Sequence, residues 1–104
     1  MGRRPNYRPA YVRGLIEGYL ALLASADTTH VGLRYLVELA DLDRALARLP
    51  QPSREVVFYH GLARLSEEDT ADVLHKSRRW VSKLYRESLE DVVFWINGIP
   101  EEEL

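Results

Sequence analysis

Cysteine is absent from this 104-residue chain. Neither a disulfide nor a thiolate zinc site can therefore form, and a reducing cytoplasm is the compartment we expect. Long apolar runs are also missing, because none approaches the roughly 18 residues that a transmembrane helix needs. The basic N-terminus leads into an amphipathic pattern and not into the apolar block of a signal peptide. We expect no membrane partner and no export signal.

Patterns typical of catalysis are missing as well. The chain has no glycine-rich phosphate loop and no G-x-S-x-G sequence. Its histidines, His30, His60 and His75, lack metal-ligand spacing. The adjacent acids Glu67 and Glu68 are explained by the favourable electrostatics of a helix N-terminus. We therefore expect no enzyme, no cofactor and no metal.

What the chain does have is the composition of a single globular domain, 46% hydrophobic and 29% charged. Apolar residues recur at helical spacing along most of it. The sequence predicts an all-α fold, a compact bundle of about five helices with a long C-terminal helix. The net charge is -2, which argues against indiscriminate coating of nucleic acid.

The first half of the chain predicts a flexible basic arm at 1–8 followed by a helical pair at 9–49. One helix is expected to begin at Pro9 and continue to about residue 24, and the second to span about 29–48. Gly14 and Gly18 lie four residues apart in the first helix and favour close helix packing. The charged positions of the second helix are typical of a solvated face. This pair is interpreted as a buttress or a dimer element.

The second half predicts a helix-turn-helix region at 50–98 and an acidic tail at 99–104. Pro50 and Pro52 favour the start of a helix near residues 53–60, for which Gly61 would be the C-cap. The last helix is expected to continue through the apolar stretch 88–96. That stretch can pack on the N-terminal pair or form a dimer surface, and both interpretations stay open here.

Residues 65–86 predict two short helices around a tight turn. Ser66 and Asp69 have the spacing of a capping box, and Ser77 is a second N-cap. Two helices so close in sequence must cross steeply, which requires small side chains at their contact. Ala71 and Val81 stand where that contact is expected.

The second of these helices is strongly basic at its start. Between residues 76 and 86 the chain has five cations and no acid: Lys76, Arg78, Arg79, Lys83 and Arg86. Positive side chains at a helix N-terminus oppose the macrodipole. Their placement hints at a negatively charged partner, and phosphate is the obvious candidate.

From Leu49 to about Glu90 the chain resembles the helix-turn-helix of region 4 of bacterial sigma factors and related phage regulators. The resemblance rests on the segments LP, REVV, LSEEDTADVL and SRRWVSKLYRESL. Ala71, Leu74 and Val81 match the small and aliphatic positions of the general motif. The chain departs from that motif where Thr70 replaces an aliphatic residue, His75 the turn glycine and Lys76 an apolar turn residue.

The predicted DNA-binding residues follow from this register. Arg78, Arg79 and Lys83 would reach base edges or phosphates, and the capped helix start would hold the DNA backbone. Trp80 is assigned to core or partner packing. The full predicted set is Lys76, Ser77, Arg78, Arg79, Ser82, Lys83, Arg86 and Arg64.

The resemblance implies a sequence-specific, DNA-binding transcription regulator of phage or bacterial type, with double-stranded DNA as its partner. A homodimer or a contact with RNA polymerase would supplement the small footprint of one module. The alternative is a sigma-like interaction protein that binds RNA polymerase or another regulator without touching DNA. A DNA-packaging or recombination accessory factor is a third interpretation of the same helix.

Overall fold

The computed structural model describes residues 6–25 and 30–98, and this part of the chain is helical with no strand. The helices in chain order are α1 (Pro9–Glu17), α2 (Tyr19–Ser25), α3 (His30–Leu46), α4 (Gln51–Val56), the π-helical segment η1 (Val57–Leu62), α5 (Glu67–Leu74) and α6 (Arg78–Gly98). The predicted all-α class and the long C-terminal helix are confirmed. No described helix is both long and apolar enough to cross a membrane.

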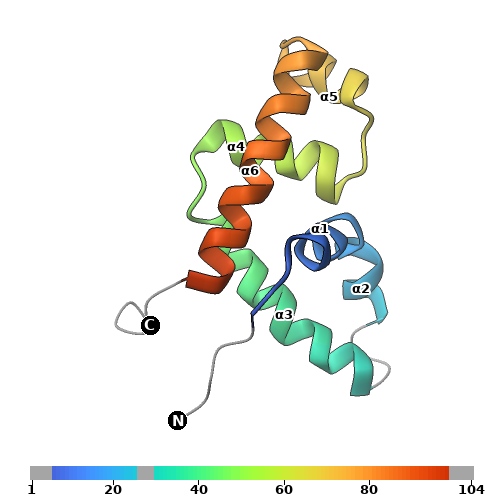
Figure 1. Cartoon of the computed structure of the whole chain (residues 1–104). Helices are drawn as coiled ribbons and strands as arrows, with labels where there is room; N and C mark the ends of the chain where they lie inside the picture. The colour runs from blue at the N-terminus through green and yellow to red at the C-terminus, as the bar shows by residue number, and fades with distance from the viewer. Residues whose placement is uncertain (1–5, 26–29, 99–104) are drawn as a thin grey trace.

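Helix α6 packs against most of the other helices. At 1.5 Å per residue its 21 residues extend about 32 Å. Figure 1 shows α5 beside the start of α6 and α3 beside its end, while α1 and α4 also contact it. One core of buried side chains from α1, α3, α4, η1 and α6 joins these elements.

The apolar end of α6 belongs largely to this core. Val92 and Ile96 are buried, and Leu89, Val93 and Trp95 pack against the core while partly exposed. The prediction that this stretch packs within the domain is thereby confirmed for its inward face. Phe94 points outward with 63% of its surface exposed.

The N-terminal helix is divided at Gly18, where one helix was expected. Gly18 has φ -102° and ψ 8°, outside the helical region, and so separates α1 from α2. Glycine favours a break here because its helix propensity is about 1 kcal/mol lower than that of alanine. Close packing at Gly14 is not observed, since a Cβ atom added there would meet nothing within 4 Å.

The third helix also differs from the prediction. It begins at Gln51 and widens into the π-helical segment η1, so Gly61 lies inside the helix and does not cap it. The left-handed residue that follows is Arg64, with φ 65°. Gly61 faces inward, and an added Cβ would lie 2.5 Å from Cγ2 of Ile16.

Residues 1–5 of the predicted arm and the predicted acidic tail at 99–104 lie outside the described residues. Tyr7, which the arm was expected to include, is buried. Its N–H donates to Oδ1 of Asn97 at 2.6 Å, and Asn97 donates back to the Tyr7 carbonyl at 2.8 Å. The two ends of the described chain are thus tied together.

The acids of α3 are not a simple solvated face, which corrects the prediction. Tyr7 donates its hydroxyl to Asp41 at 2.8 Å and Tyr19 donates to Asp43 at 3.0 Å. Tyr11 donates to Glu38 in the same way. Three tyrosines from the N-terminal segment therefore hydrogen-bond to the carboxylates of α3 and hold the helical pair together.

Candidate nucleic-acid interface

Helix α5 begins and ends as its sequence predicts. The Ser66 hydroxyl accepts a hydrogen bond of 3.0 Å from the Asp69 N–H. At the other end His75 adopts the left-handed conformation, with φ 57° and ψ 45°. The Lys76 N–H bonds to the Ala71 carbonyl at 2.9 Å and the His75 N–H to that of Asp72 at 3.3 Å. This is a Schellman motif, formed here without the usual glycine.

The two residues expected at the contact between α5 and α6 are both buried. Ala71 is 4% exposed and Val81 is fully buried. Thr70, which replaces an aliphatic residue of the general motif, is also fully buried. Its hydroxyl has no hydrogen-bond partner within the described part of the chain. Helices α5 and α6 are in contact, and α5 buries one polar atom without a hydrogen-bond partner.

Helix α6 is capped by Ser77, as predicted. The Ser77 hydroxyl accepts from the Trp80 N–H at 3.0 Å. Trp80 is half-buried and packs against the core. The ammonium of Lys76 lies 5.2 Å from the centre of the Trp80 ring, a cation–π distance. The turn and the first turn of α6 are thus held in one arrangement.

The cations of the turn and of the first half of α6 are all exposed. They are Lys76, Arg78, Arg79, Lys83 and Arg86. Among the described residues, no carboxylate forms an ion pair with any of them. Ser82, also in the predicted set, is half-buried between them. These five side chains, which we call the cationic ridge, are accessible to a partner.

Arg64 is arranged differently from the rest of the predicted set. Its guanidinium lies 3.1 Å from Glu17, at the end of α1. Arg13 also pairs with Glu17, at 2.9 Å. Arg64 is therefore held by α1 and does not belong to the cationic ridge.

Sequence reasoning missed the cluster that fixes α6 on the N-terminal helices. The Tyr85 hydroxyl donates to Glu17 at 3.1 Å, and the His60 ring contacts the Tyr85 ring edge to face at 4.5 Å. His60 itself is held by a contact of 2.6 Å between Nδ1 and the Leu65 carbonyl. No local signal in the sequence indicates this cluster, because its members come from distant segments.

The electrostatics of this cluster favour a charged Glu17 and a neutral Tyr85. Burial alone would raise the pKa of the Glu17 carboxyl, but hydrogen bonds from Arg13 and Tyr85 and the positive charges of Arg13 and Arg64 lower that pKa on balance. Burial, together with the negative charge and hydrogen bond of Glu17, raises the pKa of the Tyr85 phenol. The hydrogen bond between them is therefore retained at neutral pH.

Among the side chains that the structure describes, no group of three histidine, aspartate or glutamate residues is placed to hold a metal ion. Comparison of the chain with models of protein families, with curated proteins and with solved structures gives no match in any of the three. The fold and the cationic ridge together define a small all-helical domain in which helix α6 begins with exposed basic residues.

Proposed function

We propose that this chain is a DNA-binding transcription regulator in which α5, the turn and α6 act as a helix-turn-helix. In this proposal the first half of α6 enters the major groove of double-stranded DNA. The observation that carries it is the cationic ridge, five exposed cations without an ion-pair partner among the described residues of an acidic protein.

A purely solvated helix face explains this ridge less well. Acids belong at the start of a helix and bases at its end, because the macrodipole is positive at the N-terminus. Helix α5 follows this rule, with three acids in its first turn. Helix α6 reverses it, with Arg78 and Arg79 at its start and Glu87, Glu90 and Asp91 further along. A partner rich in phosphate would compensate for the unfavourable placement.

The geometry of α6 favours the assigned roles. Residues 79, 82, 83 and 86 recur at helical spacing and share one face, where Ser82 lies among three cations. Arg78, Arg79 and Lys83 are nearest the exposed start of the helix and would contact base edges or phosphates. Lys76 and Arg86, at the two ends of the ridge, would contact phosphates.

The resemblance to sigma region 4 supports transcription as the setting. The Ser66 cap, the buried Ala71 and the Ser77 cap are consistent with this resemblance. Because one module with this footprint has limited specificity, a second copy or RNA polymerase would be needed to select a promoter.

Charge reversal on the ridge tests the proposal. In an anisotropy titration with labelled duplex DNA at low salt, Arg78→Glu with Arg79→Glu should weaken binding by about 100-fold or more, since two attractive contacts become repulsive. Both residues are exposed, so the circular dichroism spectrum and the thermal midpoint should stay close to those of the wild type.

The matched control reverses two other exposed arginines that form no ion pair among the described residues, Arg8 before α1 and Arg54 on α4. The control has the same net charge as the ridge variant, and it should keep DNA affinity within a few-fold of the wild type. Equal loss in both variants would show a non-specific charge effect and would reject the ridge as the interface. A wild-type chain that binds no DNA even at low salt would instead favour the interaction protein.

A further inference from the structure

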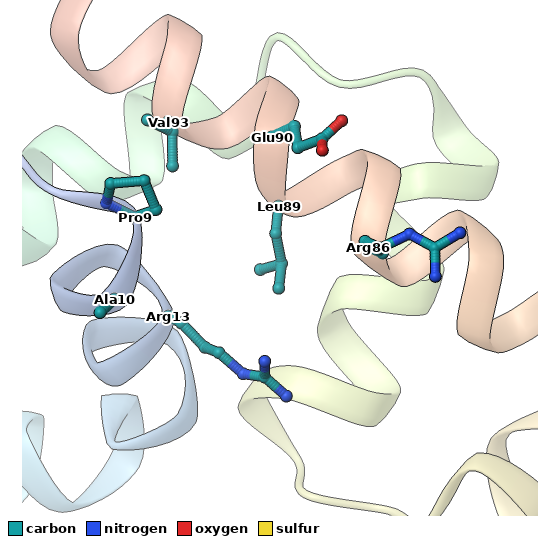
Figure 2. A pocket seen from close by; sticks show the side chains of 7 residues that line it. All are labelled: Pro9, Ala10, Arg13, Arg86, Leu89, Glu90 and Val93. Atoms are coloured by element: carbon teal, nitrogen blue, oxygen red, sulfur yellow. The ribbon is translucent and has the colours of Figure 1, made fainter.

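A cleft of about 430 Å³ opens between α1 and α6, away from the first turn of α6. Its volume lies within the range of small-molecule sites. Pro9 and Ala10 of α1 and Leu89 and Val93 of α6 form an apolar floor, which Figure 2 shows from close by. Leu89 and Val93 are half-buried, whereas Pro9 and Ala10 are exposed. The floor is therefore accessible to a ligand.

The charged residues of the cleft come from both helices. Arg13, Arg86 and Glu90 complete its lining. Figure 2 shows the side chain of Arg13 extending from α1 below Leu89, while the side chain of Arg86 extends along α6 away from Leu89. The cleft thus combines an apolar floor with one guanidinium group from each of its two helices.

The two arginines differ in the ion pairs that they form within the protein. Arg13 pairs with Glu17, but 58% of its side-chain surface stays exposed. Arg86 has no ion pair among the described residues, although Glu90 lies one turn further along α6. Its guanidinium retains the capacity for bidentate hydrogen bonds to a carboxylate.

We propose that this cleft is a binding site for an amphipathic monocarboxylate with an unbranched apolar tail. The carboxylate would bind the guanidinium of Arg86, whose planar geometry suits it, and the tail would cover the apolar floor. A ligand with one negative charge fits best, because Glu90 repels additional charge at the same rim. An ion without a tail would leave the floor exposed to water.

Decanoate is the probe, and its binding to the full chain is measured by isothermal titration calorimetry without DNA and below its micellar concentration. Decanoate should bind with saturation, while acetate, which lacks the tail, and decanol, which lacks the charge, should bind at least about tenfold more weakly. Acetate or decanol binding as tightly as decanoate would overturn the proposal.

Two substitutions locate the site. Arg86→Gln removes the unpaired guanidinium, and Ala10→Glu places bulk and negative charge on the floor at an exposed position of α1. Each should weaken decanoate binding by about tenfold or more. Arg79→Gln is the matched control, since it removes an exposed arginine of α6 outside the cleft and should leave affinity unchanged. Equal affinity in Arg86→Gln and wild type would refute the assignment.

Occupancy of the cleft has a consequence that rests on the proposed function. Arg86 belongs both to the cleft and to the cationic ridge, so a bound carboxylate would compete with DNA phosphate for it. Decanoate should therefore weaken DNA binding by the wild type and not by Ala10→Glu. Decanoate binding in a chain that binds no DNA would refute the proposed function alone, whereas DNA binding with no saturable decanoate binding would refute the ligand site alone.

Discussion

The hydroxyl of Tyr85, in the middle of α6, donates a hydrogen bond to the carboxylate of Glu17, at the end of α1. The two residues are 68 positions apart in the chain. The Glu17 carboxylate also forms ion pairs with Arg13 and Arg64. One carboxylate therefore connects three parts of the chain: α1, the loop before α5, and α6. This contact fixes the helix that carries the cationic ridge on the N-terminal half of the domain.

Removal of the Glu17 charge should destabilise the domain. Glu17→Gln loses two ion pairs and weakens the hydrogen bond from Tyr85, so we expect the free energy of unfolding to fall by about 1–2 kcal/mol near neutral pH. Urea unfolding measures the change. Glu87→Gln, an exposed glutamate of α6 without an ion pair among the described residues, is the control and should change little.

The same substitution should have a pH-dependent effect. The pKa of Glu17 is lowered in the folded protein, so its stabilisation is present above the unfolded pKa and is lost as pH falls through the folded pKa. The difference between wild type and Glu17→Gln should therefore shrink as pH falls below the ordinary range in which a glutamate carboxyl titrates. A constant difference from about pH 7 downward would contradict the role of the carboxylate charge.

Two glycine substitutions should have opposite effects. A Cβ at Gly61 would lie 2.5 Å from Cγ2 of Ile16 and 3.1 Å from the Tyr85 hydroxyl, so Gly61→Ala should destabilise by about 1–3 kcal/mol. Gly14→Ala meets nothing within 4 Å in the middle of α1 and should stabilise by about 0.5–1 kcal/mol. Thermal unfolding of both variants checks the pair. Stabilisation by Gly61→Ala would show that α1 and η1 are not in close contact.

Thr70→Val should stabilise the domain. It replaces a buried hydroxyl that lacks a hydrogen-bond partner with a methyl group of similar shape, and the expected gain is about 1 kcal/mol. Thr70→Ala removes the same hydroxyl but leaves a small cavity, so it should gain less or lose stability. Urea midpoints of the two variants distinguish these effects. A loss of stability in Thr70→Val would mean that the hydroxyl is satisfied in solution.

His75→Gly should stabilise the turn. His75 is a non-glycine residue in the left-handed region, where glycine avoids a steric cost of about 1 kcal/mol. His75→Val should destabilise, because a β-branched side chain fits this conformation poorly. We expect the thermal midpoint of His75→Gly to lie above that of the wild type and the midpoint of His75→Val to lie below it. A destabilised glycine variant would show that the His75 side chain contributes more than its backbone strain costs.

The salt dependence of DNA binding should report the number of ridge contacts. If four or five cations neutralise phosphates, the logarithm of affinity should fall with the logarithm of salt concentration with a slope between about -3.6 and -4.5. Lys83→Gln should reduce the magnitude of that slope by about one, whereas Arg64→Gln should leave it unchanged, because Arg64 is held by Glu17. Anisotropy titrations at several salt concentrations measure both.

Much of the region around the ridge could be predicted because its signals are local. The Ser66 and Ser77 caps each act over three residues, and the exposure of the cations follows from helical spacing around Val81. The break at Gly18 and the widening of η1 could not be predicted in this way. Both are small local departures from a helix, and Gly61 in particular is placed by its neighbours from α1 and α6.

Local sequence patterns are enough to specify the all-helical class, the capped helices of the α5–turn–α6 unit and the basic start of α6, since each depends on residues within one or two turns of one another. The packing of the helices, in contrast, places Glu17 against Tyr85 and Arg64, Asn97 against the backbone of Tyr7, and Arg13 and Arg86 around one cleft. These contacts join residues 47 to 90 positions apart. Their formation depends on how the helices pack against a common core, and periodicity within a single helix does not encode that arrangement.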